Sequence, residues 1–211
     1  MTSPDQQPAD YWDDRYRTIG AQSVSWFEPT PDASLGLFEL AQVTPSDSVI
    51  DIGGGASALT AALQERGHQD LTILDLSQAA LNLGARQANR PGAIRLIQAN
   101  LLSWSPDRQW DVWHDRAVFH FLTQPDERAT YRRILDQATR PHGVVAIATF
   151  ATNGPTACSG LAVCRYAADE LLAELGDDFD EIAHRTFDHI TPSGAVQPFT
   201  AVVARRRGAP T

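Results

Sequence analysis

The stretch VIDIGGGASALT, residues 49–60, decides the fold class of this chain. Its first four residues are a short, mostly apolar run that is typical of a buried strand, and three consecutive glycines follow. Ser57 is a suitable N-cap for the helix predicted after it, and Gly67 suits the C′ position of that helix. A strand that turns through glycines into a helix is typical of a nucleotide-binding α/β sheet.

Strand and helix patterns alternate through the rest of the chain. Strands are predicted at residues 49–52, 71–74, 94–99, 110–113, 144–150, 179–187 and 198–204, and helices at 35–43, 57–66, 77–89, 126–138 and 167–175. Strands separated by helices of about 10–15 residues predict βαβ units. We therefore expect an α/β fold: a Rossmann-like, seven-stranded, mostly parallel sheet with helices on both faces and a reversed last strand.

The length of 211 residues suits one α/β domain. We expect a single domain over residues 1–211 with three parts. Residues 1–44 form an N-terminal lid and helix, residues 45–150 the core that contains the glycine loop, and residues 151–211 a long loop with the closing strands. The first ten residues are polar and are predicted to be disordered.

Composition excludes several classes of protein. Asp and Glu outnumber Lys and Arg by 26 to 17, a net charge of −9, so the chain lacks the basic character of general nucleic-acid binders. All 17 cationic residues are arginine. Because there is no lysine, a P-loop lysine, a Schiff-base lysine and a Tyr/Lys reductase pair are all excluded.

The cysteines and the apolar runs restrict the function further. Cys158 and Cys164 are too few for a disulfide framework or a cysteine-only zinc site, so we expect packing residues and no metal. The polar N-terminus lacks the apolar stretch of a signal peptide. The longest apolar run, residues 144–151, is far shorter than the roughly 20 residues of a membrane span. We expect a cytoplasmic protein without nucleic-acid or membrane partners.

The glycine loop fits two classes of cofactor. Gly53 and Gly55 remove side chains where a ligand approaches the backbone, and Asp75 ends the next strand, where an acid accepts hydrogen bonds from ribose hydroxyls. The spacing from Gly53 to Ala58 also satisfies the G-x-G-x-x-A pattern of NAD-binding proteins. Asp51 is awkward beside a pyrophosphate, however, and suits a cationic amino group such as that of S-adenosylmethionine.

The motifs together resemble the class I S-adenosylmethionine-dependent methyltransferase family over roughly residues 45–150. The matching positions are Asp51, Gly53, Gly55, Ser57, Asp75, Ala99-Asn100, residues 110–113 and residues 141–143. The resemblance implies that the glycine loop holds the methionine part, that Asp75 holds the ribose, and that Leu76 packs on the adenine. It also implies that Asn100 and Leu101 contact the adenine. Asn100 stands where the family often has Asp, and its carbonyl accepts the same hydrogen bond.

The N-terminal flank adds to this resemblance. Residues 11–16 (YWDDRY) and 25–27 (SWF) are similar to the start of the branch that includes eukaryotic elongation-factor lysine methyltransferases. The similarity implies that Trp12, Tyr16 and Trp26 line the cofactor pocket, where a sulfonium against an aromatic face gains about 0.5–2 kcal/mol per contact. The alternative is an aromatic cluster that packs the N-terminus onto the sheet.

The residues after the fourth strand bear on the acceptor. That branch has an acid followed by Lys-Gly-Thr, whereas Asp115 here is followed by Arg116-Ala117-Val118. We expect His114, Asp115 and Arg116 at the mouth of the crevice, with Asp115 and Arg116 near the cofactor, and Asp115 or His120 as a base. Phe119 and Phe121 are expected to face the core. The loop at 153–166 stands where the family forms its acceptor wall.

These observations predict an S-adenosylmethionine-dependent methyltransferase. The departure from the lysine-methylating pattern favours a small-molecule acceptor, and a protein lysine is the alternative. An NAD-binding oxidoreductase and a cofactor-binding module without catalysis are the remaining candidates.

Overall fold

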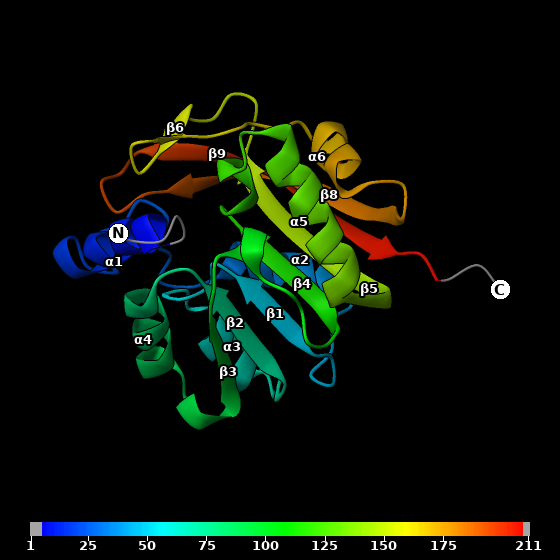
Figure 1. The fold of residues 1–211 in the computed structure, drawn as a ribbon, viewed down its shortest axis with the longest axis horizontal. Helices are drawn as coiled ribbons and strands as arrows, with labels where there is room; N and C mark the ends of the chain where they lie inside the picture. Colours follow the sequence, from blue (N-terminus) through cyan, green and yellow to red (C-terminus); the bar gives the residue numbers. More distant parts are fainter. Residues whose placement is uncertain (1–5, 209–211) are drawn as a thin grey trace.

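A computed structural model describes residues 6–208, and its centre is a seven-stranded sheet (Figure 1). The strands lie in the order β3-β2-β1-β4-β5-β9-β8. Neighbours from β3 to β5 are parallel, whereas β9 is antiparallel to both β5 and β8. This arrangement confirms the predicted mostly parallel sheet with a reversed last strand. Their bounds are β1 Val49–Ile52, β2 Leu71–Asp75, β3 Ile94–Gln98, β4 Trp110–Arg116, β5 Thr139–Phe150, β8 Phe179–Ile190 and β9 Val196–Arg206.

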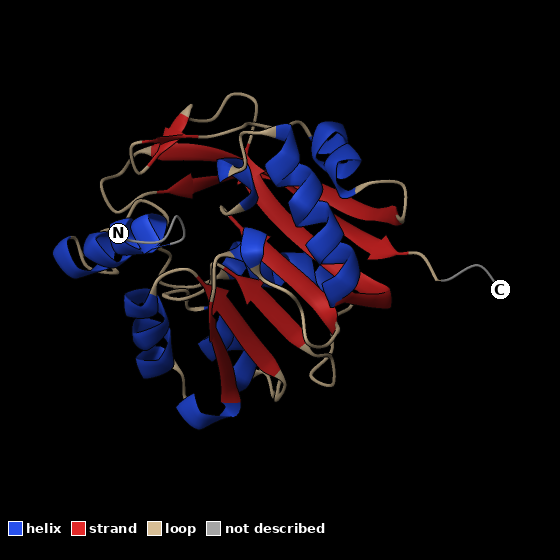
Figure 2. Ribbon diagram, in the orientation of Figure 1, coloured by secondary structure: helices blue, strands red, loops and turns tan. Residues whose placement is uncertain are grey.

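Helices cover both faces of the sheet, as predicted (Figure 2). On one face, α5 and α6 pack over a cluster that contains Trp110, Trp113 and Tyr131, all fully buried. On the other face, α2 and α3 form a second cluster with β1, β4 and β5, and α4 forms a third with β2 and β3. The helices are α1 Gln6–Thr18, α2 Asp32–Leu40, α3 Leu59–Glu65, α4 Gln78–Gln87, α5 Pro125–Ala138 and α6 Ala168–Leu175.

Short elements connect the strands and helices. The 3₁₀ turns η2 (Leu101–Ser103) and η3 (Phe119–Phe121) follow β3 and β4 at the carboxyl end of the sheet, and η1 (Pro91–Ala93) precedes β3 at the amino end. A two-stranded hairpin of β6 (Ala157–Cys158) and β7 (Leu161–Ala162) lies in the loop after β5.

None of the helices between residues 6 and 208 combines the length and the apolar character that crossing a bilayer requires.

The N-terminus is more ordered than its composition predicts. Residues 6–10 belong to α1, although the first ten residues were expected to be disordered; residues 1–5 lie outside the described residues. Ala9 and Tyr16 are buried where α1 meets the domain. Tertiary contact therefore stabilises a helix whose polar sequence would not form it alone.

Candidate active site

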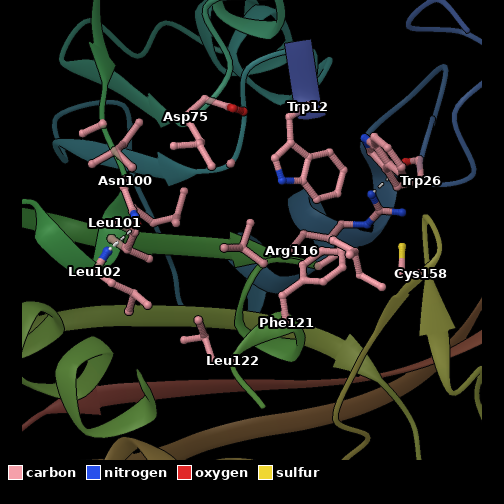
Figure 3. A pocket seen from close by; sticks show the side chains of 18 of the residues that line it. Trp12, Trp26, Asp75, Asn100, Leu101, Leu102, Arg116, Phe121, Leu122 and Cys158 are labelled. Atoms are coloured by element: carbon pink, nitrogen blue, oxygen red, sulfur yellow. Dashed lines mark hydrogen bonds between the residues drawn. The ribbon is translucent and has the colours of Figure 1, made fainter. Parts of the chain in front are cut away.

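A cavity of about 220 Å³, called here the main cavity, lies at the carboxyl ends of β1, β2 and β4 (Figure 3). A smaller one of about 40 Å³, the inner cavity, shares five of its lining residues. Side chains from the N-terminal segment (residues 6–28), the strand ends, η2, η3 and the β6–β7 hairpin line the main cavity. They are Trp12, Tyr16, Trp26, Ile52, Gly53, Leu74, Asp75, Leu76, Ala99, Asn100, Leu101, Leu102, Arg116, Ala117, Val118, Phe121, Leu122, Cys158 and Leu161.

The glycine loop requires glycine for two reasons: two carboxylates pack against its backbone, and one of its residues adopts a positive φ. A Cβ on Gly54 would lie 2.0 Å from Asp51 Oδ2, and one on Gly55 would lie 2.7 Å from Asp75 Oδ2. Gly53 adopts φ +68°, a conformation that favours glycine. The loop backbone therefore lies directly against Asp51 and Asp75, the two acids that sequence analysis assigned to the cofactor.

Asp51 offers an unused acceptor beside the inner cavity. Its Oδ1 lies 2.6 Å from His114 Nδ1, and His114 Nε2 lies 2.9 Å from Ser34 Oγ. Oδ2 of Asp51 is buried and has no hydrogen-bond partner. A buried carboxylate oxygen without a donor is costly, so the site suits a ligand group that donates hydrogen bonds and carries positive charge.

Asp75 joins the glycine loop to the start of α4. Its Oδ2 accepts from Gly55 N at 3.0 Å and its Oδ1 accepts from Ser77 N at 2.8 Å. Ser77 is the N-cap of α4, as predicted. Burial raises the pKa of Asp75 from 3.8 to about 6, even though both backbone donors favour the carboxylate. A carboxylate has lone pairs for further donors, so Asp75 remains able to bind hydroxyl groups from the main cavity.

The end of the cavity next to Asp75 is apolar. Leu76, Leu101 and Leu102 line it, with Asn100 between β3 and η2 (Figure 3). The side-chain oxygen of Asn100 accepts from Leu102 N at 3.1 Å, which fixes the first turn of η2. The oxygen that was expected to accept a hydrogen bond from the adenine therefore already accepts one from the backbone of η2.

Aromatic side chains form the opposite wall. Trp12 lies 5.4 Å from Phe121 and 5.7 Å from Trp26 between ring centroids, both in edge-to-face arrangement. Trp26 Nε1 donates to Tyr16 OH at 3.2 Å, and burial raises the pKa of Tyr16. Phe119 is fully buried in the core as expected, but Phe121 lines the cavity instead. The three aromatic residues predicted from the N-terminal motif therefore meet at one place.

Arg116 fastens the N-terminal segment to the end of β4. Its guanidinium donates to Trp26 O at 3.1 Å and to Glu28 Oε1 at 2.8 Å, and it lies 3.3 Å from His189 Nδ1. His189 Nε2 in turn lies 2.6 Å from Ser25 O. Arg116 lines both cavities, and its contact with the cofactor stays a prediction.

Asp115 lies inside the protein, which corrects its expected position at the mouth of the crevice. His114, which was also expected at the mouth, is buried beside the inner cavity. Asp115 is fully buried and accepts from Val118 N, Phe119 N and Tyr131 OH at 2.9–3.3 Å. Its carboxylate therefore closes the turn from β4 into η3. Burial raises the pKa of Asp115 to about 6.

His120 is also fully buried, between the rings of Phe121 and Phe150 at 4.6 and 4.7 Å. Neither ring nitrogen has a hydrogen-bond partner, and burial lowers the pKa of His120 to about 3. Neither Asp115 nor His120 is among the residues that line the main cavity or the inner cavity. The turn after β4 bends inward, and the sequence pattern alone did not predict this.

Cys158, Leu122 and Leu161 line the cavity without having been singled out for it. Cys158 and Leu161 belong to the loop that was expected to form the acceptor wall. Their place in this loop is the one feature of the sequence that could have predicted their contact with the cavity. Cys158 is buried, and burial raises the pKa of its thiol. Across residues 6–208, no three His, Cys, Asp or Glu side chains are grouped as a metal site.

Comparison with known sequences finds one matching family. Residues 49–143, from the start of β1 into β5, match the methyltransferase domain family. A mouse eEF1A lysine and N-terminal methyltransferase is 24% identical over 130 residues, which is 60% of this chain and 18% of that protein. The match thus covers less than a fifth of the length of this relative.

Solved structures share the fold over nearly the whole chain. An S-adenosylmethionine-dependent methyltransferase from Anabaena variabilis is 14% identical with a TM-score of 0.75, covering 98% of this chain and 96% of its own. The N-methyltransferase NodS from Bradyrhizobium japonicum, in complex with S-adenosylhomocysteine, is 15% identical with a TM-score of 0.72, covering 93% and 98%. The 1,6-didemethyltoxoflavin-N1-methyltransferase from Burkholderia thailandensis is 20% identical with a TM-score of 0.64, covering 98% and 92%.

The family match bears on the two classes of cofactor that the glycine loop allowed. A methyltransferase domain favours S-adenosylmethionine over NAD. The geometry fits this molecule, because the unpartnered Oδ2 of Asp51 suits an α-amino group and no pyrophosphate has to lie beside that acid.

Proposed function

We propose that this methyltransferase transfers a methyl group from S-adenosylmethionine to a small-molecule acceptor. The observation that carries the proposal is the division of the main cavity (Figure 3). At one end, Asp75 and the leucines around Asn100 suit a ribose and an adenine. At the other end, Trp12, Phe121 and Cys158 form a mostly apolar wall for the acceptor.

The cofactor-binding residues act on different parts of the molecule. Asp51 accepts hydrogen bonds from the amino group, and the backbone at Gly53 and Gly55 approaches the methionine part. Asp75 accepts from the ribose hydroxyls, while Leu76 and the η2 residues pack on the adenine. The aromatic wall of Trp12, Tyr16 and Trp26 faces the sulfonium, which supplies an activated methyl group when the cofactor is bound.

Orientation and exclusion of water supply the catalysis in this proposal. Asp115 and His120 are buried away from the main cavity, and the raised pKa of Cys158 keeps its thiol protonated. The acceptor atom therefore attacks as a neutral group or as an anion that is formed before binding. In-line methyl transfer depends mainly on how closely the two reacting atoms are held, so a mostly apolar cavity with few polar groups is sufficient.

Three features support a small acceptor. The N-terminal segment lies over the cavity, which leaves little room for a polypeptide. The Burkholderia methyltransferase, whose structure holds the small molecule 1,6-didemethyltoxoflavin, aligns over 98% of this chain. Arg116-Ala117-Val118 also replaces the Lys-Gly-Thr of the lysine-methylating pattern.

A protein lysine is the second candidate acceptor. It is favoured by the similarity to the mouse eEF1A lysine and N-terminal methyltransferase. Among the described residues that line the main cavity, Asp75 is the one carboxylate, and it lies at the ribose end. The acceptor end therefore offers no acid to attract a lysine ammonium.

The test separates the candidates in one experiment. The protein is incubated with methyl-labelled S-adenosylmethionine and either a filtered metabolite extract or the retained proteins. Label in the metabolite fraction supports the proposal, whereas label in protein bands supports the lysine alternative. Calorimetry with S-adenosylhomocysteine is run beside it. Product binding without transfer to either fraction would support a module without catalysis and overturn the proposal.

A further inference from the structure

The side chain of Asp13 joins the N-terminal segment to the amino end of α4. Asp13 Oδ1 accepts from Ser77 Oγ at 2.6 Å and from Ala79 N at 3.0 Å. Ser77 Oγ also accepts from Ala80 N at 3.0 Å as the N-cap of α4. The Asp13 carboxylate is only 15% exposed. It lies where unpaired backbone N–H groups and the helix dipole favour negative charge.

The turn that receives Asp13 also carries the ribose-binding acid of the proposed site. Ser77 N donates to Asp75 Oδ1, and Gly55 N donates to Asp75 Oδ2. Asp13, Ser77, Asp75 and Gly55 thus form one hydrogen-bonded series from α1 to the glycine loop. Helix α1 packs against α4 along this contact (Figure 1). A change in the position of α1 therefore alters the hydrogen bonds at the ribose side of the cavity.

Asp13 also fixes an aromatic residue of the acceptor wall. Trp12, its neighbour in the chain, projects from α1 into the main cavity toward Phe121 (Figure 3). On the opposite side of the segment, Tyr11 OH donates to Ser159 O, and Arg116 holds Trp26 O. These contacts join the segment to the β6–β7 hairpin and to β4, whereas Asp13 joins it to α4. The three attachments together surround Trp12.

We propose that Asp13 is a positioning residue for methyl transfer, which holds α1 closed over the cofactor by capping α4. The inference rests on the proposed function. With α1 closed, Trp12 stays against the sulfonium side of the cavity and the site excludes water. The large core clusters draw their buried members from other elements. Release of α1 therefore leaves the sheet domain folded.

The test compares Asp13→Asn and Asp13→Ala with two controls. Asp14→Asn removes the same charge at an exposed neighbouring position. Arg17→Gln removes the ion pair that joins Asp13 Oδ2 to Arg17 at 2.8 Å within α1, and leaves the contact with α4 in place. Measurements are the affinity and dissociation rate of S-adenosylhomocysteine, the rate of trypsin cleavage after Arg15 in the ligand-free protein, and the unfolding midpoint.

We expect Asp13→Ala to weaken S-adenosylhomocysteine binding about 10-fold, mainly through faster dissociation, because the contact with α4 is a charged hydrogen bond. Cleavage after Arg15 should accelerate in the same variant. Asp13→Asn should lie between Asp13→Ala and the wild type, since its amide oxygen still accepts both bonds without the charge. Both controls should stay within about twofold of the wild type, as exposed charges contribute little.

Two results would overturn the inference. One is wild-type affinity and wild-type cleavage in Asp13→Ala, which would make Asp13 a surface cap without influence on the site. The other is a fall in the unfolding midpoint of Asp13→Asn that accounts for its whole loss of affinity. If the wild type binds neither S-adenosylmethionine nor S-adenosylhomocysteine, the proposed function fails. The cleavage comparison in the ligand-free variants still tests the closure of α1 in that case.

Discussion

Trp12 from the N-terminal helix and Phe121 from the turn after β4 pack edge to face in one wall of the main cavity, with ring centroids 5.4 Å apart. Figure 3 shows both rings at the side of the cavity that lies away from Asn100. A cation bound between Asp75 and this pair would lie against aromatic faces, and S-adenosylmethionine carries such a cation whereas S-adenosylhomocysteine does not.

Trp12→Ala should therefore weaken the binding of S-adenosylmethionine more than that of S-adenosylhomocysteine. A cation–π contact of about 0.5–2 kcal/mol corresponds to an additional loss of about 2- to 30-fold for the sulfonium. Calorimetry with both ligands measures the difference. Trp104→Phe, which alters a ring packed on Trp110 away from the cavity, is the control. Equal losses for the two ligands would show that Trp12 acts by shape alone.

Asp51→Asn should weaken the binding of both ligands by about 10- to 100-fold, because both carry the amino group and a hydrogen bond between charged groups is lost. Asp111→Asn is the matched control. Asp111 lies near the amino end of β4, away from the main cavity at the carboxyl ends of the strands. It accepts hydrogen bonds from Ser48 and forms an ion pair with Arg140. Its replacement should lower the unfolding free energy without changing affinity. An Asp51→Asn protein with the wild-type dissociation constant would place the amino group elsewhere.

Asp75 should make ligand-free stability depend on pH between about 4 and 6. Its carboxyl ionises near pH 3.8 in the unfolded chain and near pH 6 in the folded protein, so the folded state binds more protons in between. The stabilisation from protonated Asp75 is complete below pH 3.8 and is lost as pH rises through 6. Urea unfolding of Asp75→Asn should show less of this loss. Burial also raises the pKa of Asp115, so the part of the pH dependence that comes from Asp115 should remain in this variant.

Ligand binding should have the opposite pH dependence. Ribose hydroxyls donate to the ionised carboxylate, so the affinity for S-adenosylhomocysteine should increase as pH rises through 6 and a proton should be released. Calorimetry in two buffers with different ionisation enthalpies measures the released proton. Asp75→Asn should bind weakly at every pH, without this trend. Proton release that persists in Asp75→Asn would have to come from another group.

His120→Phe should keep methyl transfer and reduce sensitivity to acid. The lowered pKa, about 3 against an ordinary value of 6.5, keeps His120 neutral in the folded protein while the unfolded chain takes up a proton. The stability that this provides is complete above pH 6.5 and is lost as pH falls toward 3. Phenylalanine fits between Phe121 and Phe150 without unpaired ring nitrogens, so the unfolding free energy should not fall at pH 7. A folded His120→Phe protein without activity would restore His120 as a base.

The sequence by itself determined the sheet and its cofactor end. Strand β1, the glycines and Asp75 are local features, because a short apolar run, a tight turn and an acid at a strand end each follow from neighbouring residues. Parallel strands then bring their carboxyl ends together, so Asp51 and Asp75 had to meet at the glycine loop. The predicted N-cap at Ser77 and the reversal of β9 followed from local patterns as well.

Only the tertiary structure decided which side chains face the cavity after the strands end. Asp115 and His120 follow β4 in sequence, but the turn into η3 directs both into the core and leaves Phe121 at the cavity. Helix α1 forms because Asp13, Tyr16 and Ala9 find partners on the folded domain. These outcomes depend on contacts between residues far apart in the chain, which local propensity and periodicity do not contain.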